Sequence, residues 1–291
     1  MSNLERRYRR LLKVLPGWYR RDREEEMVSI FLAERTDELD LEHSWPGWGE
    51  TWATLGLGVR THLAAGAALV HVPDRARWRG EVVRALGVLG LLLGVFYAGA
   101  AALHLVLTRG GSPWVPPAAP VRWFELAPVV AFAALLAGRR TVAKAVAALA
   151  VVPVVVALSE PGPVLFSLAF QVPSLVLFAC LCLGFHREAP TPPARRPAWW
   201  GGGALVLGLG AGLAPGVGLV VVALLAVAVR VVAYVRGDVV LGRALSVFAA
   251  LLLVPVAVLL AGEVTWVVCA LAVSLVGSVV APVRRARVAL S

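Results

Sequence analysis

Eight long apolar stretches, separated by short polar connections, constrain this chain more than any other feature of its sequence. A helix needs about 20 mostly apolar residues to cross a bilayer core of about 30 Å, and most of these stretches approach that length. Of the 291 residues, 59% are apolar and 16% are charged, whereas soluble domains average about 45–50% apolar. The expected fold class is therefore all-α, a polytopic membrane helix bundle. The expected spans are 82–107, 121–137, 141–159, 164–185, 199–213, 217–235, 239–261 and 264–281.

Basic residues in the connections predict the orientation of the chain, because Lys and Arg collect on the cytoplasmic side of membrane proteins. Connections expected outside carry only Arg109 and Arg122. Arg230 lies near the inner end of the sixth span, and its side chain is expected to reach the interface. The pattern predicts a multi-pass plasma-membrane protein with both termini in the cytoplasm. Connections expected inside carry Arg139, Arg140, Lys144, Arg187, Arg195, Arg196, Arg236, Arg243, Arg284, Arg285 and Arg287.

Charge divides the chain into a polar head and a basic membrane region. Residues 1–79 hold 13 Lys/Arg and 12 Asp/Glu, whereas residues 80–291 hold 15 and 6. The excess arginine lies between apolar runs, where it orients the chain, so no direct nucleic-acid binding is expected. No secretory-type apolar stretch occurs in the first 80 residues, so the head is expected in the cytoplasm. The expected divisions are a head (1–70), a linker (71–80), spans one to four (81–186), a Pro/Arg-rich linker (187–198), spans five to eight (199–283) and a basic tail (284–291).

The head has the periodicity of three short amphipathic helices. Pro16 and Gly17 end the first helix, and Ser44 and Pro46 signal the start of the third. The apolar stripe of the first helix is Leu4, Tyr8, Leu11, Leu12 and Leu15. The second helix is expected to bury Met27, Ile30 and Phe31. The third presents Trp48, Trp52, Leu55, Val59 and Leu63 on one face.

Three ordered motifs in the head resemble a known family. They are LERRYRRLLKVLP, WYRRDREEEM and WPGWGETWATLGLGVRTHL, within residues 3–68. This pattern is similar to the actinobacterial version of the HAAS signalling domain, also called the permease prefix domain. The resemblance implies a small helical domain before a membrane region of variable sequence. It also implies a link to PadR-like transcriptional regulators, and it implies no catalytic residue.

The head's charges are strongly segregated. Residues 1–23 hold eight Lys/Arg and two acids, whereas residues 24–50 hold one Arg and nine acids. Three interpretations are open: the two blocks pair with each other, the arginines bind anionic lipid headgroups, or the acidic face docks a basic partner protein. The candidates for partner contacts are Arg6, Arg7, Arg10, Glu24, Glu25, Glu26, Trp48 and Trp52.

No catalytic or cofactor motif occurs in the chain. The sequence lacks a Walker-type loop, and its five histidines form no zinc motif. We therefore expect no enzymatic activity, no metal and no cofactor. Small residues four apart, as in Gly90/Gly94 and Gly208/Gly212, predict close helix packing.

Polar residues within or beside the spans are the candidates for ligand sensing, because such residues are costly in a membrane. Glu160 and Glu263 follow two Val-Pro-Val helices in matching places, which suggests either an acidic pair that senses a cation or two solvated loop carboxylates. Pro153, Pro173 and Pro255 are expected to kink their helices, as in transporters. The full set of sensing candidates is His104, Glu125, Glu160, Gln171 and Glu263.

A weak internal similarity relates residues 138–158 to residues 237–260, each with a basic start and a Val-Pro-Val core. It leaves open a four-plus-four arrangement of the spans. The leading functional hypothesis is a membrane sensor whose head couples to a PadR-like regulator or another cytoplasmic protein. The alternative is a transporter or permease subunit for a small, possibly apolar substrate. The sequence leaves the oligomeric state open.

Overall fold

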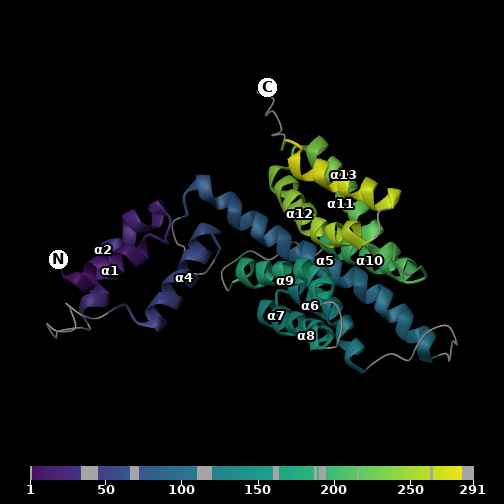
Figure 1. The fold of residues 1–291 in the computed structure, drawn as a ribbon, viewed down its shortest axis with the longest axis horizontal. Helices are drawn as coiled ribbons and strands as arrows, with labels where there is room; N and C mark the ends of the chain where they lie inside the picture. The colour runs from purple at the N-terminus through teal and green to yellow at the C-terminus, as the bar shows by residue number, and fades with distance from the viewer. Residues whose placement is uncertain are drawn as a thin grey trace. The chain divides into compact units, whose positions relative to one another are not determined.

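The computed structural model describes residues 2–33, 45–65, 72–109, 120–159, 164–186, 189, 195–214, 216–262 and 265–283. Every regular element within these residues is helical, which confirms the all-α prediction for this part of the chain (Figure 1). The chain forms two compact units, Met1–Gly80 and Glu81–Ser291.

The first unit contains helices α1 (Asn3–Leu12), α2 (Gly17–Ala33) and α4 (Trp48–His62). The predicted stripe of α1 forms its core, in which Leu4, Tyr8, Leu12 and Leu15 are buried. Tyr8 stacks on Phe31 of α2 with ring centroids 3.9 Å apart. The prediction for α2 was wrong at one position, because Ile30 is 59% exposed and Val28 is buried instead.

Helix α4 packs through small residues rather than through its aromatic face. Thr54, Gly58 and Thr61 are its buried residues. A Cβ added at Gly58 would lie 2.8 Å from a methyl group of Val14, so this contact requires a small residue. Trp48 and Trp52 therefore point out of the unit, with 80% and 68% of their surfaces exposed.

Helix α5 (Asp74–Arg109) begins within the predicted linker 71–80 and continues without a break to Arg109. At about 1.5 Å per residue, its 36 residues exceed a bilayer core of about 30 Å. Within the described residues, α5, α11 (Val217–Arg236) and α12 (Val239–Gly262) are long and apolar enough to cross a membrane. These three helices indicate a membrane protein.

The other expected spans also fall on helical segments. Residues 141–159, expected as one helix, form two helices that are interrupted at 150–151, where Pro153 cannot donate a hydrogen bond to Leu149. Residues 237–260, the proposed counterpart, lie almost entirely in the continuous helix α12. The helical segments at these other expected spans are η1 (Pro120–Leu126), α6 (Ala127–Leu136), α7 (Arg140–Leu149), α8 (Val152–Ser159), α9 (Val164–Gly184), α10 (Arg195–Ala211) and α13 (Trp266–Val280).

Glycines of α5 bring its neighbours into close contact. A Cβ added at Gly90 would lie 2.6 Å from Leu177 Cβ of α9, and one at Gly94 would lie 2.6 Å from Pro128 Cβ of α6. A Cβ at Gly208 of α10 would overlap the carbonyl oxygen of Phe96. These contacts confirm the predicted close packing, and they place α5 between α6, α9 and α10.

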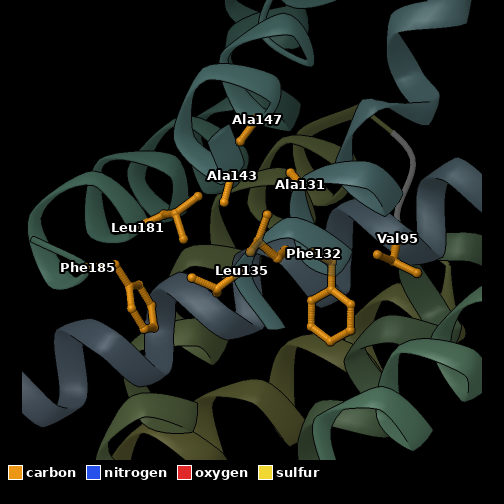
Figure 2. Packing of buried hydrophobic residues seen from close by; sticks show 9 residues of the cluster. Val95, Ala131, Phe132, Leu135, Ala143, Ala147, Leu181 and Phe185 are labelled. Atoms are coloured by element: carbon orange, nitrogen blue, oxygen red, sulfur yellow. The ribbon is translucent and has the colours of Figure 1, made fainter. Parts of the chain in front are cut away.

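The core beside α5 is built from four elements. Figure 2 shows side chains of α5, α6, α7 and α9 gathered around Leu135 of α6, with Phe132 on the side of Val95. Leu135 and Ala143 are fully buried, and Ala147 lets α7 approach closely because its side chain is small. This packing fixes α7 against α6 and α9 and so positions one wall of the cavity described below.

Helices α11, α12 and α13 lie side by side (Figure 1). Gly237, with φ of 68°, ends α11 in the left-handed conformation that glycine adopts without strain, and the chain turns directly into α12. The expected snorkelling of Arg230 was wrong, because Arg230 is only 3% exposed. Its guanidinium donates 2.9 Å to the Ala281 carbonyl, so oxygens just beyond the end of α13 take the place of water.

Candidate functional site

A cavity of about 430 Å³ lies within the second unit, between α5, the η1–α6 segment, α7–α8 and α9. This volume falls in the range of about 300–1,000 Å³ that is typical of small-molecule sites. Most of its wall is apolar, including Leu91, Pro128, Phe170 and Phe178. Its polar lining residues are Tyr97, Glu125, Gln171 and Ser174.

Two predicted sensing residues, Glu125 and Gln171, therefore line one cavity although they lie far apart in the sequence. Glu125 lies in the 3-10 helix that precedes α6, and Gln171 lies two residues before the helix proline Pro173 of α9. Ala150 and Pro153, from the interruption between α7 and α8, line the same cavity. The Leu149 carbonyl lacks its usual helical donor there, because residue 153 is proline.

The carboxylate of Glu125 is only loosely paired. Arg122 Nε lies 3.8 Å from Glu125 Oε1, which is within ion-pair distance but too long for a strong hydrogen bond. Arg122 Nη1 also lies 3.1 Å from the ring nitrogens of His104, so the nitrogen that accepts from it carries no proton. A carboxylate accepts several hydrogen bonds, and Glu125 thus keeps capacity for a further donor.

This arrangement suits an amphipathic cation. A carboxylate, an amide and a hydroxyl would meet an ammonium group, while the aromatic and aliphatic walls would cover an apolar body. A metal site is a poorer match, because no group of three or more His, Cys, Asp or Glu gathers among the described residues.

A second cavity of about 400 Å³ lies between α5, α10, α11 and α12. Its lining is apolar apart from the indole groups of Trp199 and Trp200, and it includes Phe96 and Phe248. It offers no charged group to orient a ligand, and a hydrocarbon chain would fill it.

The head's charge clusters are partly paired with each other, as the self-pairing interpretation expects. Arg9, which the sequence did not single out, donates 2.6 and 2.9 Å hydrogen bonds to the two oxygens of Glu25. It also lies 3.1 Å from Glu5 and 3.8 Å from Glu24. The spacing of four residues between Glu5 and Arg9 is the sequence feature that could have identified Arg9 as an ion-pairing residue.

The remaining head candidates have different surroundings. Arg6 is exposed and donates to Asn3 at 2.7 Å, and Arg10 is exposed. The Arg7 guanidinium stacks over Trp45 at 4.7 Å. Glu26 pairs with Arg23 on its own helix at 2.7 Å. Glu160 and Glu263 lie outside the described residues.

Acidification is expected to weaken the contact between α1 and α2. The hydrogen bonds from Arg9 lower the pKa of Glu25 below its ordinary value of 4.5. A carboxyl whose pKa is lowered on folding stabilises the fold above its unfolded pKa, and this contribution disappears as the pH falls through the folded value. Protection of α1 amides from hydrogen exchange should therefore fall modestly below about pH 4.5, and Arg9→Gln should remove that change. An equal change in both proteins would contradict the assignment.

Comparison with known protein families, curated proteins and solved structures finds no match to this chain. The resemblance of the head to the HAAS domain stays a prediction from its three sequence motifs.

Proposed function

We propose that this chain is an integral membrane sensor that binds a small amphipathic cation in the Glu125 cavity. In this proposal the head couples to a PadR-like transcriptional regulator or another cytoplasmic protein. The observation that carries it is the gathering of Glu125 and Gln171 in one largely apolar cavity. The coupling partner is supported by the motif resemblance of the head.

The proposed topology has eight membrane-spanning helices and cytoplasmic termini. Helices occupy each of the expected spans within the described residues, and basic residues concentrate in alternate connections. This topology would bring Glu125 to the outer half of the membrane, where a cation from outside could reach it.

Glutamine at position 125 should weaken cation binding selectively. Octylammonium is a suitable probe, with octanol as its uncharged counterpart of the same chain length. A charge-assisted hydrogen bond contributes about 1.5–3 kcal/mol, so Glu125→Gln should lower octylammonium affinity about tenfold or more. Octanol binding should change little, because it makes no use of the negative charge. Calorimetry of the protein in nanodiscs, with empty discs subtracted, measures both.

Glu81→Gln is the matched control, since Glu81 lies on α5 and does not line the cavity. It should leave octylammonium affinity unchanged. Equal losses from both substitutions would indicate a general effect of net charge and would contradict the cavity site. Deletion of residues 1–70 should leave octylammonium binding intact and abolish regulator output, and unchanged output would contradict the signalling role.

Transport of the same cation is the second candidate. The interrupted helix α7–α8 beside the cavity favours it, because transporters commonly form their sites at broken helices. Uptake of labelled octylammonium into proteoliposomes, compared with Glu125→Gln, separates the two functions. Protein-dependent uptake that Glu125→Gln removes would support transport, and binding without uptake would support sensing.

A further inference from the structure

Helix α4 carries an aromatic face that no described residue of its unit covers. Trp48, Trp52 and Val59 are 80%, 68% and 52% exposed. Their spacing of four and seven residues puts them on one side of the helix. The other side is the small-residue face that packs into the head. Large exposed apolar side chains gathered on one face indicate an interaction surface.

The charged residues that the structure describes around this face are mainly basic. Arg60 of α4 is exposed, and Arg7 stacks over Trp45 at 4.7 Å, just before α4 begins. The only acid of α4, Glu50, faces the head interior. There the pKa of Tyr8 is raised, first by burial and then by the negative charge of Glu50. A surface of tryptophan and arginine with its acid turned inward is complementary to an anionic surface.

The end of α4 is tied to the beginning of α5. Arg79 Nη1 donates 3.1 Å to the carbonyl oxygen of His62, the last residue of α4. Arg79 lies just before the apolar part of α5, which is one of the candidate membrane spans. The exposed residues Arg75 and Arg77 lie on the same turns of α5. Arginine and tryptophan at this position are typical of the membrane–water interface.

We propose that the α4 face formed by Trp48, Trp52 and Val59 lies on the surface of an anionic bilayer. Tryptophan rings are stable at headgroup depth, where their apolar bodies leave water and their indole N–H groups stay hydrated. Arg60 would lie close to the headgroup charges. The short connection to α5, a candidate membrane span, raises the effective concentration of α4 at the bilayer, so a weak interaction suffices. The proposal does not depend on the cavity or on a regulator.

A fluorophore at position 59 tests the contact in the full chain. Cys180, Cys182 and Cys269 are replaced by alanine, and Val59→Cys is labelled with an environment-sensitive dye. The protein is placed in nanodiscs of phosphatidylcholine, with or without phosphatidylglycerol, and brominated lipids serve as quenchers. We expect strong quenching at position 59 in anionic discs and weaker quenching in neutral ones. Ser29→Cys on the exposed side of α2 is the control and should stay unquenched.

Two further variants test how much Arg60 and the two tryptophans contribute to the contact with the bilayer. An arginine near an anionic surface contributes about 1 kcal/mol, so Arg60→Gln should lower the ratio of docked to undocked head about fivefold. Trp48→Ser combined with Trp52→Ser should abolish quenching at position 59. Equal quenching at positions 29 and 59, or none at either, would overturn the proposal. A dye at position 59 that is shielded from iodide yet unquenched by brominated lipid would also overturn it, because protein would then cover the face.

Discussion

Gly208→Leu is expected to force helices α5 and α10 apart and to lower the free energy of unfolding of the membrane unit by about 3 kcal/mol, at the upper end of the range for overpacking. A Cβ at Gly208 would overlap the carbonyl oxygen of Phe96, which is backbone and has no rotamer to change. Gly99 of α5 makes the reciprocal contact, because its Cβ would overlap the Leu205 carbonyl. The two helices touch backbone to backbone, so relief requires one helix to move. Unfolding in mixed micelles with increasing SDS, followed by circular dichroism, measures the loss.

Gly210→Leu is the matched control for this prediction. Gly210 lies on the same helix two residues later, it is exposed, and a Cβ there would meet no atom within 4 Å. The same change of residue type should therefore cost little or even stabilise the helix, since glycine is about 1 kcal/mol less favourable than alanine in a helix interior. Equal losses for the two variants would mean that helix propensity, rather than the α5–α10 contact, determines stability.

The helical class of this chain could be predicted because long apolar stretches leave few alternatives. Backbone groups in a bilayer must bond within their own segment, so an apolar run of sufficient length implies a helix. The lengths of individual helices could be predicted less well, because an apolar run does not show where a helix is interrupted. Residues 145–158 are apolar throughout, and apolarity does not reveal that the helix stops at 150–151. Pro153 was the local signal, but a proline can also remain inside a helix, as Pro255 does in α12.

Which faces meet inside the bundle could be predicted only where residue size restricts the choice. Gly90, Gly94 and Gly208 mark close approaches because only glycine admits them. Elsewhere leucine and valine surround each helix, and periodicity does not distinguish a protein-facing side from a lipid-facing side. The meeting of Glu125 and Gln171 therefore came from the fold, although each residue was singled out by its polarity alone.

In the head, periodicity located the core of α1, because exposing an apolar side chain to water is unfavourable and the apolar residues therefore fall on the buried face. The same reasoning failed for Ile30, whose helix buries Val28 instead, whereas Phe31 is buried as predicted. For α4 it identified the aromatic face correctly but not the packing face, which consists of Thr54, Gly58 and Thr61. A face used for binding and a face used for packing have similar periodicity, and the structure is needed to tell them apart.

Arg230→Ala is expected to lower the stability of the α11–α13 part by about 3 kcal/mol, because hydrogen bonds from charged groups contribute about 1.5–3 kcal/mol each. Arg230 donates to the Ala281 carbonyl at 2.9 Å and approaches the Pro282 carbonyl at 3.5 Å and Ser246 Oγ at 3.4 Å. Ser246 Oγ lies 3.0 Å from the Ser278 carbonyl, so one buried cluster joins three helices. Removing the guanidinium takes this donor from the Ala281 carbonyl and opens a hole. Hydrogen exchange near residues 278–283, together with SDS unfolding, measures the effect.

Arg236→Ala and Arg230→Met decide what the buried arginine contributes. Arg236 is exposed at the end of the same helix, and its loss should cost about 0.5 kcal/mol or less. Methionine at position 230 fills most of the volume but donates nothing, so its stability should fall between wild type and Arg230→Ala. The two variants test whether hydrogen bonds to the oxygens beyond the end of α13, where the helix dipole is negative, offset the free-energy cost of desolvating the guanidinium. A methionine variant more stable than wild type would show that they do not, and that Arg230 is retained for a reason other than stability.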